Sequence, residues 1–273
     1  PELLPVGWAA AVLGRRVVFD VHENVPGQLR TKPWIPRPLR RPLAGMAARM
    51  LRIGEKRVAI TLAEAGYSDL FAETHPVFPN YLTGTPPPPR PADPAIGVVY
   101  LGDVTAERGL AVAVAAAGAA GAKIMTLMGR CSPDLRSELS EIAASHQLQL
   151  DFHGFVTPDA ALHIASGAVM GLSPLLDTPN YRSSLPTKVL EYLAVGIPTL
   201  ASDLPGTRLV VGDKPGVVLV EPGDVAAWRD AIRDVAGNAT LRDAAGEGAD
   251  AIHLSYVWPA DEVRKFYRSL LDD

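Results

Sequence analysis

From residue 95 onward, short apolar runs alternate with segments in which apolar residues recur every three or four positions. Apolar runs bounded by turn residues predict buried strands, and the longer spacing predicts helices. The predicted strands are 96–101, 123–128, 148–152, 168–172, 197–201 and 217–220, and the predicted helices are 108–119, 133–147, 158–166, 186–195, 225–236 and 241–253. This alternation predicts an α/β domain with a parallel sheet covered by helices on both faces.

The chain before residue 86 has fewer predicted strands, at 17–21, at 58–62 and in a shorter candidate at 76–78. An amphipathic helix is predicted between them, because apolar residues recur there at helical spacing. These residues are Leu39, Leu43, Met46, Met50 and Ile53.

Four consecutive prolines, Pro86 to Pro89, predict an extended linker, because proline cannot continue a helix or a central strand. A second amphipathic helix is predicted near the end of the chain. The predicted organisation is a partial N-terminal Rossmann-like domain at 1–85, a linker at 86–94, a C-terminal Rossmann-like nucleotide-sugar domain at 95–255 and a terminal helix at 256–273.

Composition and charge narrow the class of function. The 273 residues are 48% hydrophobic and 21% charged, which is typical of a soluble globular protein. The net charge of −4 argues against nucleic-acid binding. One cysteine, Cys131, allows no intrachain disulfide and fits a reducing cytoplasm. No cysteine and histidine cluster has metal-ligand spacing, so we expect neither a metal ion nor a cofactor.

Positive charge is concentrated between Arg30 and Arg57, where nine basic residues and one acid give a net charge of +8. The rest of the chain therefore carries −12. Two interpretations of this 30–57 segment remain open. In the first, its helix lies on an anionic membrane, at the inner face of the cytoplasmic membrane, or meets an anionic acceptor. In the second, it packs its apolar stripe on the sheet.

The segment 184–206 predicts a loop, a short helix, a turn and a buried strand. Ser184 or Thr187 can cap the helix. Lys188 and Glu191 are three positions apart and therefore share one helix face. A cation beside the N–H groups of a helix N-terminus suits a diphosphate, and a carboxylate one turn later suits sugar or ribose hydroxyls.

This segment resembles the donor-site signature of family-4 glycosyltransferases, which are retaining enzymes of the GT-B fold. Members often carry Pro-x-Lys-x-x-Glu-Tyr, then Ala-x-Gly-x-Pro, a strand and Ser-Asp. Many carry two glutamates separated by seven residues; Glu191 matches the second, and the first falls on Ser183. The matching residues are Pro186, Lys188, Glu191, Tyr192, Ala194, Gly196, Pro198, Ser202 and Asp203.

The resemblance implies an α/β fold of two Rossmann-like domains in GT-B arrangement, with parallel sheets flanked by helices. In the family the N-terminal domain begins with a glycine-rich strand–loop–helix unit, which is not found here, so we expect that domain to be incomplete. The resemblance also implies that the terminal helix, 256–273, crosses back to the N-terminal domain.

Other candidate residues follow predicted strands. Gly102 permits close approach of a phosphate, and the resemblance gives Arg108 a phosphate-binding role, whereas Asp103 stands where the family often has an arginine. His22, near the end of strand 17–21, matches a family histidine near the donor sugar; the alternative is a histidine that bonds loop backbone. Three more candidates for the donor site are Gly129, His153 and Arg182. The alternative for His153 is an ordinary turn residue, and the alternative for Arg182 is an exposed loop residue.

We therefore expect transfer of a hexose or related sugar from a nucleotide-diphosphate sugar to a saccharide, lipid-linked or small-molecule acceptor, with retention and without a metal. The alternatives are a non-catalytic nucleotide-sugar-binding module and a GT-B nucleotide-sugar 2-epimerase. The expected catalytic residues are His22 and Glu191. The expected donor-binding residues are Gly102, Arg108, Gly129, His153, Arg182, Ser184, Thr187, Lys188 and Glu191.

Overall fold

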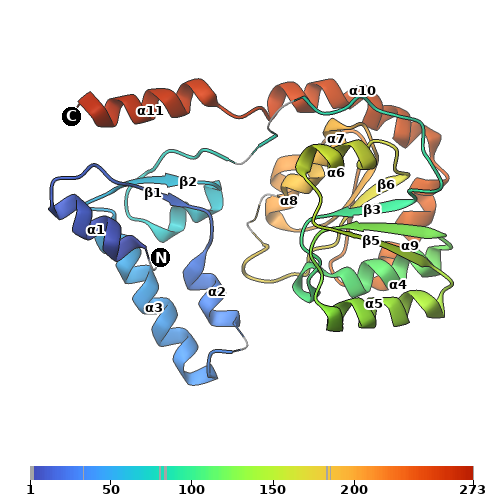
Figure 1. Ribbon diagram of the computed structural model, residues 1–273, viewed down its shortest axis with the longest axis horizontal. Helices are drawn as coiled ribbons and strands as arrows, with labels where there is room; N and C mark the ends of the chain where they lie inside the picture. The colour runs from blue at the N-terminus through green and yellow to red at the C-terminus, as the bar shows by residue number, and fades with distance from the viewer. Residues whose placement is uncertain are drawn as a thin grey trace. The chain divides into compact units, whose positions relative to one another are not determined.

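The computed structural model describes residues 3–32, 34–79, 81–82, 85–182, 184 and 186–272 (Figure 1). Ser183, the position of the first family glutamate, lies outside the described residues. Contacts within the chain divide it into two compact units. The first unit comprises residues 1–80 and 258–273, and the second comprises residues 81–257.

A six-stranded sheet forms the centre of the second unit, and all its neighbouring strands pair in parallel. The strand order is β5-β4-β3-β6-β7-β8. From β3 the chain adds β4 and β5 on one side, and then returns to add β6, β7 and β8 on the other side, so the order of strands reverses between β3 and β6. In doubly wound folds, ligands bind at the carboxyl ends of strands beside such a reversal. The strands are β3 (Val98–Leu101), β4 (Ile124–Met128), β5 (Gln149–Gly154), β6 (Met170–Ser173), β7 (Thr199–Ser202) and β8 (Val217–Val220).

Helices cover both faces of this sheet. Each predicted strand and helix of the second unit is confirmed, with ends that differ by at most two residues; the short helix α8 was not predicted. The helical segments are η2 (Ala106–Arg108), α4 (Leu110–Ala120), α5 (Pro133–Ser145), α6 (Pro158–Ala165), α7 (Thr187–Ala194), α8 (Pro205–Val211), α9 (Val225–Ala236) and α10 (Ala239–Ser255).

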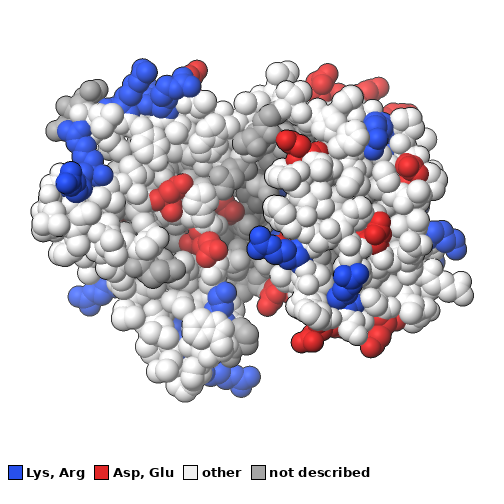
Figure 2. Space-filling model, in the orientation of Figure 1, with Lys and Arg blue, Asp and Glu red and all other residues white. Residues whose placement is uncertain are grey.

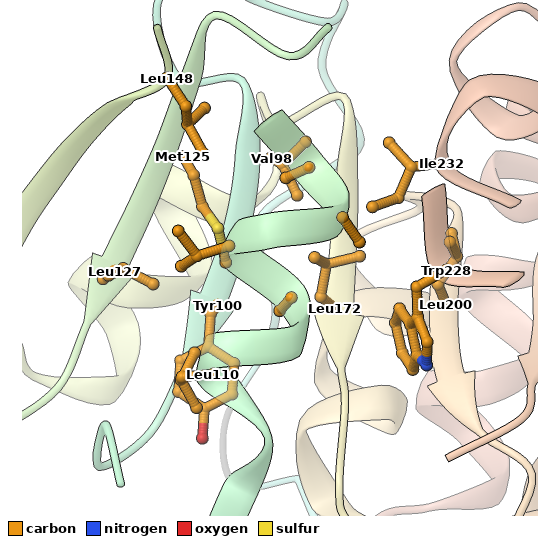
Figure 3. Packing of buried hydrophobic residues seen from close by; sticks show 14 of the residues in the cluster. Val98, Tyr100, Leu110, Met125, Leu127, Leu148, Leu172, Leu200, Trp228 and Ile232 are labelled. Carbon is orange, nitrogen blue, oxygen red and sulfur yellow. The ribbon is translucent and has the colours of Figure 1, made fainter. Parts of the chain in front are cut away.

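The side chains of β3 alternate between two hydrophobic clusters, one on each face of the sheet. Val98 and Tyr100 join one hydrophobic cluster, whereas Val99 and Leu101 join the cluster on the opposite face. Successive strand residues point to opposite faces, so a continuous apolar run lets one strand fill both layers. Figure 3 shows the first cluster, in which strand residues pack with Trp228 of α9.

The proline-rich segment 86–94 is held against the second unit. The Arg90 guanidinium donates from Nε to Ser166 Oγ at 2.9 Å and from Nη2 to the His163 carbonyl at 2.8 Å. In turn, Arg242 Nη2 donates to the Arg90 carbonyl at 2.9 Å. These bonds place the segment on the surface of the second unit as an ordered strap.

The first unit has a two-stranded parallel sheet among its described residues, with Val18 opposite Ala59. The predicted strand at 76–78 forms an isolated bridge between Val77 and Leu62. On α11, Phe266 contacts Phe78 edge to face, with ring centres 5.6 Å apart. The elements are α1 (Leu4–Val12), β1 (Val18–Val21), α2 (Val25–Thr31), α3 (Arg37–Gly54), β2 (Ala59–Leu62), η1 (Ala65–Leu70) and α11 (Ala260–Asp272).

Candidate functional site

A pocket of about 360 Å³ opens at the carboxyl ends of β3 and β4 in the second unit. Four of the predicted donor-site residues line it: Gly102, Arg108, Gly129 and Glu191. Its other lining residues are mainly apolar and come from the ends of β3 and β4, from the loop before α6 and from α6 itself. These lining residues are Leu101, Asp103, Met128, Phe155, Val156, Pro158, Ala161 and Leu162.

Two glycines make the floor of this pocket. Gly102 has φ of +108°, and a Cβ there would lie 2.9 Å from Nη1 of Arg108 and 3.7 Å from Cε of Lys188. At Gly129 a Cβ would meet the Gly102 carbonyl oxygen. Any larger residue would fill the space where two cationic side chains approach the end of β3. The glycines therefore leave backbone exposed to a ligand beside positive charge.

Arg108 comes from η2 and reaches back over the end of β3. Its half-buried guanidinium interacts with the side chains of Tyr100 and Tyr181. The next residue, Gly109, has φ of +73°, and a Cβ on it would collide with the Pro174 carbonyl. This close approach between the start of α4 and the loop after β6 fixes the position of Arg108.

Lys188 lies in the first turn of α7 and is 9% exposed. Its Nζ sits 5.0 Å from the centre of the Tyr100 ring. Burial is the main cause that lowers the Lys188 pKa to about 7, and the positive charge of Arg108 adds to it. The charge of Glu191 acts in the opposite direction and raises the pKa. Within the described part of the chain, no carboxylate lies close enough to form an ion pair with Lys188 or Arg108. Among the described residues the two cations therefore form no ion pair, and Glu191 favours the charge of Lys188 only from a longer distance.

Glu191 lies one helical turn after Lys188 and is half-buried on the pocket wall. Burial raises the pKa of its carboxyl, and the neighbouring charge of Lys188 acts in the opposite direction. As a carboxylate it can only accept hydrogen bonds, which suits the hydroxyl groups of a ribose or a sugar.

Tyr192, the next residue on α7, joins the two strands at the reversal. Its hydroxyl accepts the Leu101 N–H at 2.8 Å and donates to the Leu172 carbonyl at 3.3 Å. The ladder between β3 and β6 pairs only Val98–Val99 with Met170–Gly171, so the hydroxyl bonds the strand ends beyond it. A Cβ on Gly171 would overlap the Tyr192 ring at 2.4 Å.

Lys188 and the remaining second-unit candidates are not among the residues that line the pocket. Arg182 makes a two-bond ion pair with Asp177, at 2.7 and 3.1 Å, and is largely exposed. His153 bonds Asp151 at 2.9 Å. Ser184 and Thr187 flank the start of α7, and the N-cap residue is Pro186, whose own side chain makes no cap hydrogen bond. The prediction that Ser184 or Thr187 is the N-cap residue is therefore wrong, because the helix begins directly after proline.

His22 belongs to the first unit, where Nε2 bonds Asp20 Oδ2 at 2.7 Å. Asp20 also accepts the Thr61 hydroxyl at 2.8 Å, from the directly opposite position on β2. The Tyr67 hydroxyl donates to the His22 carbonyl at 3.1 Å. These bonds orient His22 in a pocket of about 570 Å³ that Glu23 also lines.

Sequence reasoning missed the role of two aromatic residues. Tyr100 looks like an ordinary strand residue, yet its ring faces Lys188 and its hydroxyl donates to the Asp103 carbonyl at 3.1 Å. Burial raises the Tyr100 pKa to about 12. Phe155 lines the pocket and is 68% exposed, and the centre of its ring lies 5.5 Å from Cζ of Arg130. An exposed phenylalanine after a strand is the signal that could have identified it.

Two further findings concern metals and membranes. Among the described residues, no group of three or more His, Cys, Asp or Glu side chains is arranged to hold a metal ion. None of the described helices combines the length and apolar composition needed to cross a membrane.

Comparisons with known proteins bear on this site. The family described as Glycosyl transferases group 1 matches residues 95–238, which include the whole pocket. A D-inositol 3-phosphate glycosyltransferase from Nocardioides is 35% identical over 96 residues, covering 34% of this chain. The match spans only 21% of that relative's length.

Solved structures resemble nearly the whole chain. Sucrose-phosphate synthase from Thermosynechococcus elongatus has a TM-score of 0.71 and 16% identity, over 98% of this chain and 72% of its own. HepE from Anabaena, solved with UDP and glucose, has a TM-score of 0.73 and 13% identity, over 98% of this chain and 76% of its own. These similarities confirm the predicted α/β, GT-B fold class.

Proposed function

This chain belongs to the Glycosyl transferases group 1 family, and on that premise we propose that it transfers a hexose or related sugar from a nucleotide-sugar to an acceptor, with retention of configuration, as a family-4 enzyme. The observation that carries the proposal is the pair of cations that approach Gly102: Arg108, which lines the pocket, and Lys188, which lies behind the lining. Cleavage of a nucleotide-sugar leaves a diphosphate, whose charge these cations would neutralise.

The two cations suit the diphosphate in different ways. Arg108 offers a planar fork of donors that can bind two phosphate oxygens together, whereas Lys188 acts as a compact charge. The positive end of the α7 dipole adds to both. Because Lys188 is buried beside another cation, its protonation becomes more favourable as negative charge develops on the leaving group. This differential stabilisation would accelerate transfer.

The rest of the pocket fits the other parts of a donor. Glu191 would accept hydrogen bonds from ribose or sugar hydroxyls. The apolar wall of Val156, Leu162 and the exposed Phe155 ring would face the base. HepE was solved with UDP and glucose, so UDP-glucose is the first donor to test on this chain.

His22 is the proposed group of the first unit that approaches the sugar or positions the acceptor. Its bonds to Asp20 hold the ring at the end of β1. Among the described lining residues of the second-unit pocket we assign none as a nucleophile, and we propose attack by the acceptor on the leaving-group face. We propose that the reaction needs no divalent metal and that the enzyme acts in the cytoplasm, where the single cysteine stays reduced.

The test is to incubate the chain with UDP-glucose and a mixture of saccharide, lipid-linked and small-molecule acceptors, with and without EDTA. An α-linked product from the α-linked donor, formed equally in EDTA and identified by NMR, is the expected result. A β-linked product would contradict retention. Donor binding without transfer or hydrolysis would support a binding module, and a 2-epimer of the donor would support an epimerase.

A further inference from the structure

The segment 174–182, which follows β6, carries a tyrosine that the proposed function does not yet use. Tyr181 is half-buried, and its side chain interacts with the guanidinium of Arg108. Tyr100, on β3, interacts with the same guanidinium. Arg108 is therefore held by two phenol groups, one from each of the strands that meet at the reversal or from the loop directly after it.

Two phenols suit the task of holding an arginine for an anionic ligand. A phenol oxygen can accept a hydrogen bond from a guanidinium without cancelling its charge, whereas a carboxylate would neutralise it. The Tyr100 hydroxyl donates its own proton to the Asp103 carbonyl, at 3.1 Å, so its oxygen can still accept. Contacts made before binding also reduce the rotamer entropy that the Arg108 side chain loses when a ligand arrives.

Bonds on both sides of Tyr181 close the segment that carries it. The Arg182 guanidinium donates from Nε to Asp177 Oδ1 at 2.7 Å and from Nη2 to Asp177 Oδ2 at 3.1 Å. The Tyr181 N–H donates to the Thr178 carbonyl at 3.0 Å. The Arg182 carbonyl accepts the Gly206 N–H of α8 at 2.8 Å, which ties the end of the segment to the unit. The ion pair thus brackets Tyr181.

The start of the same segment is fixed beside Arg108. The Pro174 carbonyl and Cδ2 of Leu176 both lie against Gly109, where a Cβ would have no room. Leu175, between them, is 4% exposed. Because Gly109 follows Arg108 directly, both ends of the contact between Arg108 and Tyr181 are held in place.

The charges of this segment do not themselves attract a diphosphate, because Arg182 and Asp177 are paired with each other. Figure 2 shows acidic and basic side chains interspersed on the displayed face of the second unit, at the right of the view. Among the described residues, that face has no continuous basic patch. Attraction of a phosphate to the pocket therefore depends on how its own cations are aimed.

We propose that Tyr181 is a positioning residue that aims the Arg108 guanidinium at the diphosphate of the donor, and that the ion pair of Asp177 with Arg182 closes the segment that carries it. This inference rests on the proposed function, because it names what holds one of the two cations of the donor site. It gives Arg182 a structural role in place of the direct donor contact expected from the sequence.

Tyr181→Phe removes only the hydroxyl group. The probe is whichever of UDP, GDP, ADP and dTDP binds the wild-type chain most tightly in calorimetric titration. Its affinity should fall about five- to tenfold in Tyr181→Phe, because a hydrogen bond to a charged group is lost. Tyr81→Phe is the matched control: Tyr81 belongs to the same unit, and within the described part of the chain its hydroxyl makes no hydrogen bond. The control should change affinity by less than about twofold.

A role through Arg108 predicts that the two residues are coupled. Arg108→Met should weaken binding by about tenfold or more. In that background Tyr181→Phe should change affinity by less than about twofold, because the group that it positions is gone. The same five- to tenfold loss in both backgrounds would show that Tyr181 acts without Arg108, and would overturn the proposal.

The sign of the Asp177→Asn effect separates closure of the segment from direct phosphate binding by Arg182. This change removes a negative charge and releases Arg182, so a direct contact predicts tighter binding of the nucleotide. Loss of closure predicts binding that is roughly threefold weaker, with a similar loss in Arg182→Gln and no further loss in the double variant. Tighter binding by Asp177→Asn would overturn the closing role of the ion pair.

Failure of the proposed function would look different. If none of the four nucleotides binds, or if Arg108→Met binds as tightly as the wild type, the donor pocket itself is wrong and this inference falls with it. If Arg108→Met weakens binding but Tyr181→Phe does not, this inference alone is overturned. Urea unfolding of each variant checks that the affinities are measured on folded protein.

Discussion

The ammonium group of Lys188 lies 5.0 Å from the centre of the Tyr100 ring, in a place that water barely reaches. The face of the ring stabilises a cation, but the pKa of Lys188 still falls to about 7 because burial and Arg108 both disfavour the charge. A bound diphosphate would reverse this balance. The predictions about the donor site follow from that relationship.

Replacement of Lys188 by methionine should weaken the binding of a nucleoside diphosphate by an order of magnitude or more. A hydrogen bond to a charged group contributes about 1.5–3 kcal/mol, and methionine keeps most of the buried volume. Calorimetric titration of both proteins with the nucleotide measures the change.

Lys214→Met is the matched control, because Lys214 also lies over a tyrosine ring, at 5.8 Å from the centre of Tyr256. It belongs to the same unit but is not among the side chains that approach Gly102. Its replacement should leave nucleotide affinity within twofold of the wild type. Unchanged affinity in Lys188→Met would remove that lysine from the site.

Nucleotide binding should take up a proton above pH 7. In the free protein Lys188 loses its proton as the pH rises through about 7, whereas beside a diphosphate its pKa should be higher. Affinity should therefore be greatest below pH 7 and fall as the pH rises. Titrations at pH 8 in two buffers of different ionisation enthalpy should give different observed enthalpies, and Lys188→Met should abolish the difference. Buffer-independent enthalpies in the wild type would contradict the prediction.

Gly102→Ala should weaken both folding and nucleotide binding. The φ of +108° is strained for alanine, at a cost of about 1–3 kcal/mol, and the new Cβ would displace the Arg108 guanidinium. Gly246→Ala in α10 is the control, since a Cβ there meets nothing within 4 Å. Urea unfolding and calorimetric titration should show losses for Gly102→Ala alone. Wild-type behaviour in both assays would mean that the Gly102 backbone is not crowded by Arg108.

Tyr192→Phe should reduce the free energy of unfolding by about 1–3 kcal/mol, because it leaves the Leu101 N–H and the Leu172 carbonyl without their buried partner. Tyr267→Phe, at an exposed position on α11, should change stability by less than 0.5 kcal/mol. Chemical denaturation followed by circular dichroism compares the two. Equal stability of both variants would show that the hydroxyl does not hold the strand ends together.

The second unit was predictable from the sequence because its strands are short, buried and bounded by helices. The Val217–Val220 and Val225–Ala236 segments have the predicted ends. The first unit was harder to predict. The continuous apolar composition of α1 gives no periodicity. The apolar stripe on α3 left its buried face open, and the structure buries Ala44, Ala47, Leu51 and Gly54 of this helix.

The proposed donor site was predictable where the signal is local. Lys188 and Glu191 share a helix face through their spacing alone, and Gly102 follows a recognisable strand. The contact between Lys188 and Tyr100 could not be predicted, because it joins residues far apart in the chain. The same is true of the bond from Thr61 to Asp20, which depends on the register between β1 and β2.

The most direct test of the donor pocket is calorimetric titration of the chain with UDP, GDP, ADP and dTDP, repeated with Glu191→Ala. We predict that one nucleotide binds clearly more tightly than the others, and that its affinity falls in the variant because the hydroxyl acceptor is lost. If none of the four binds to the wild-type chain, the paired cations over Gly102 do not form a nucleotide site, and the central claim is wrong.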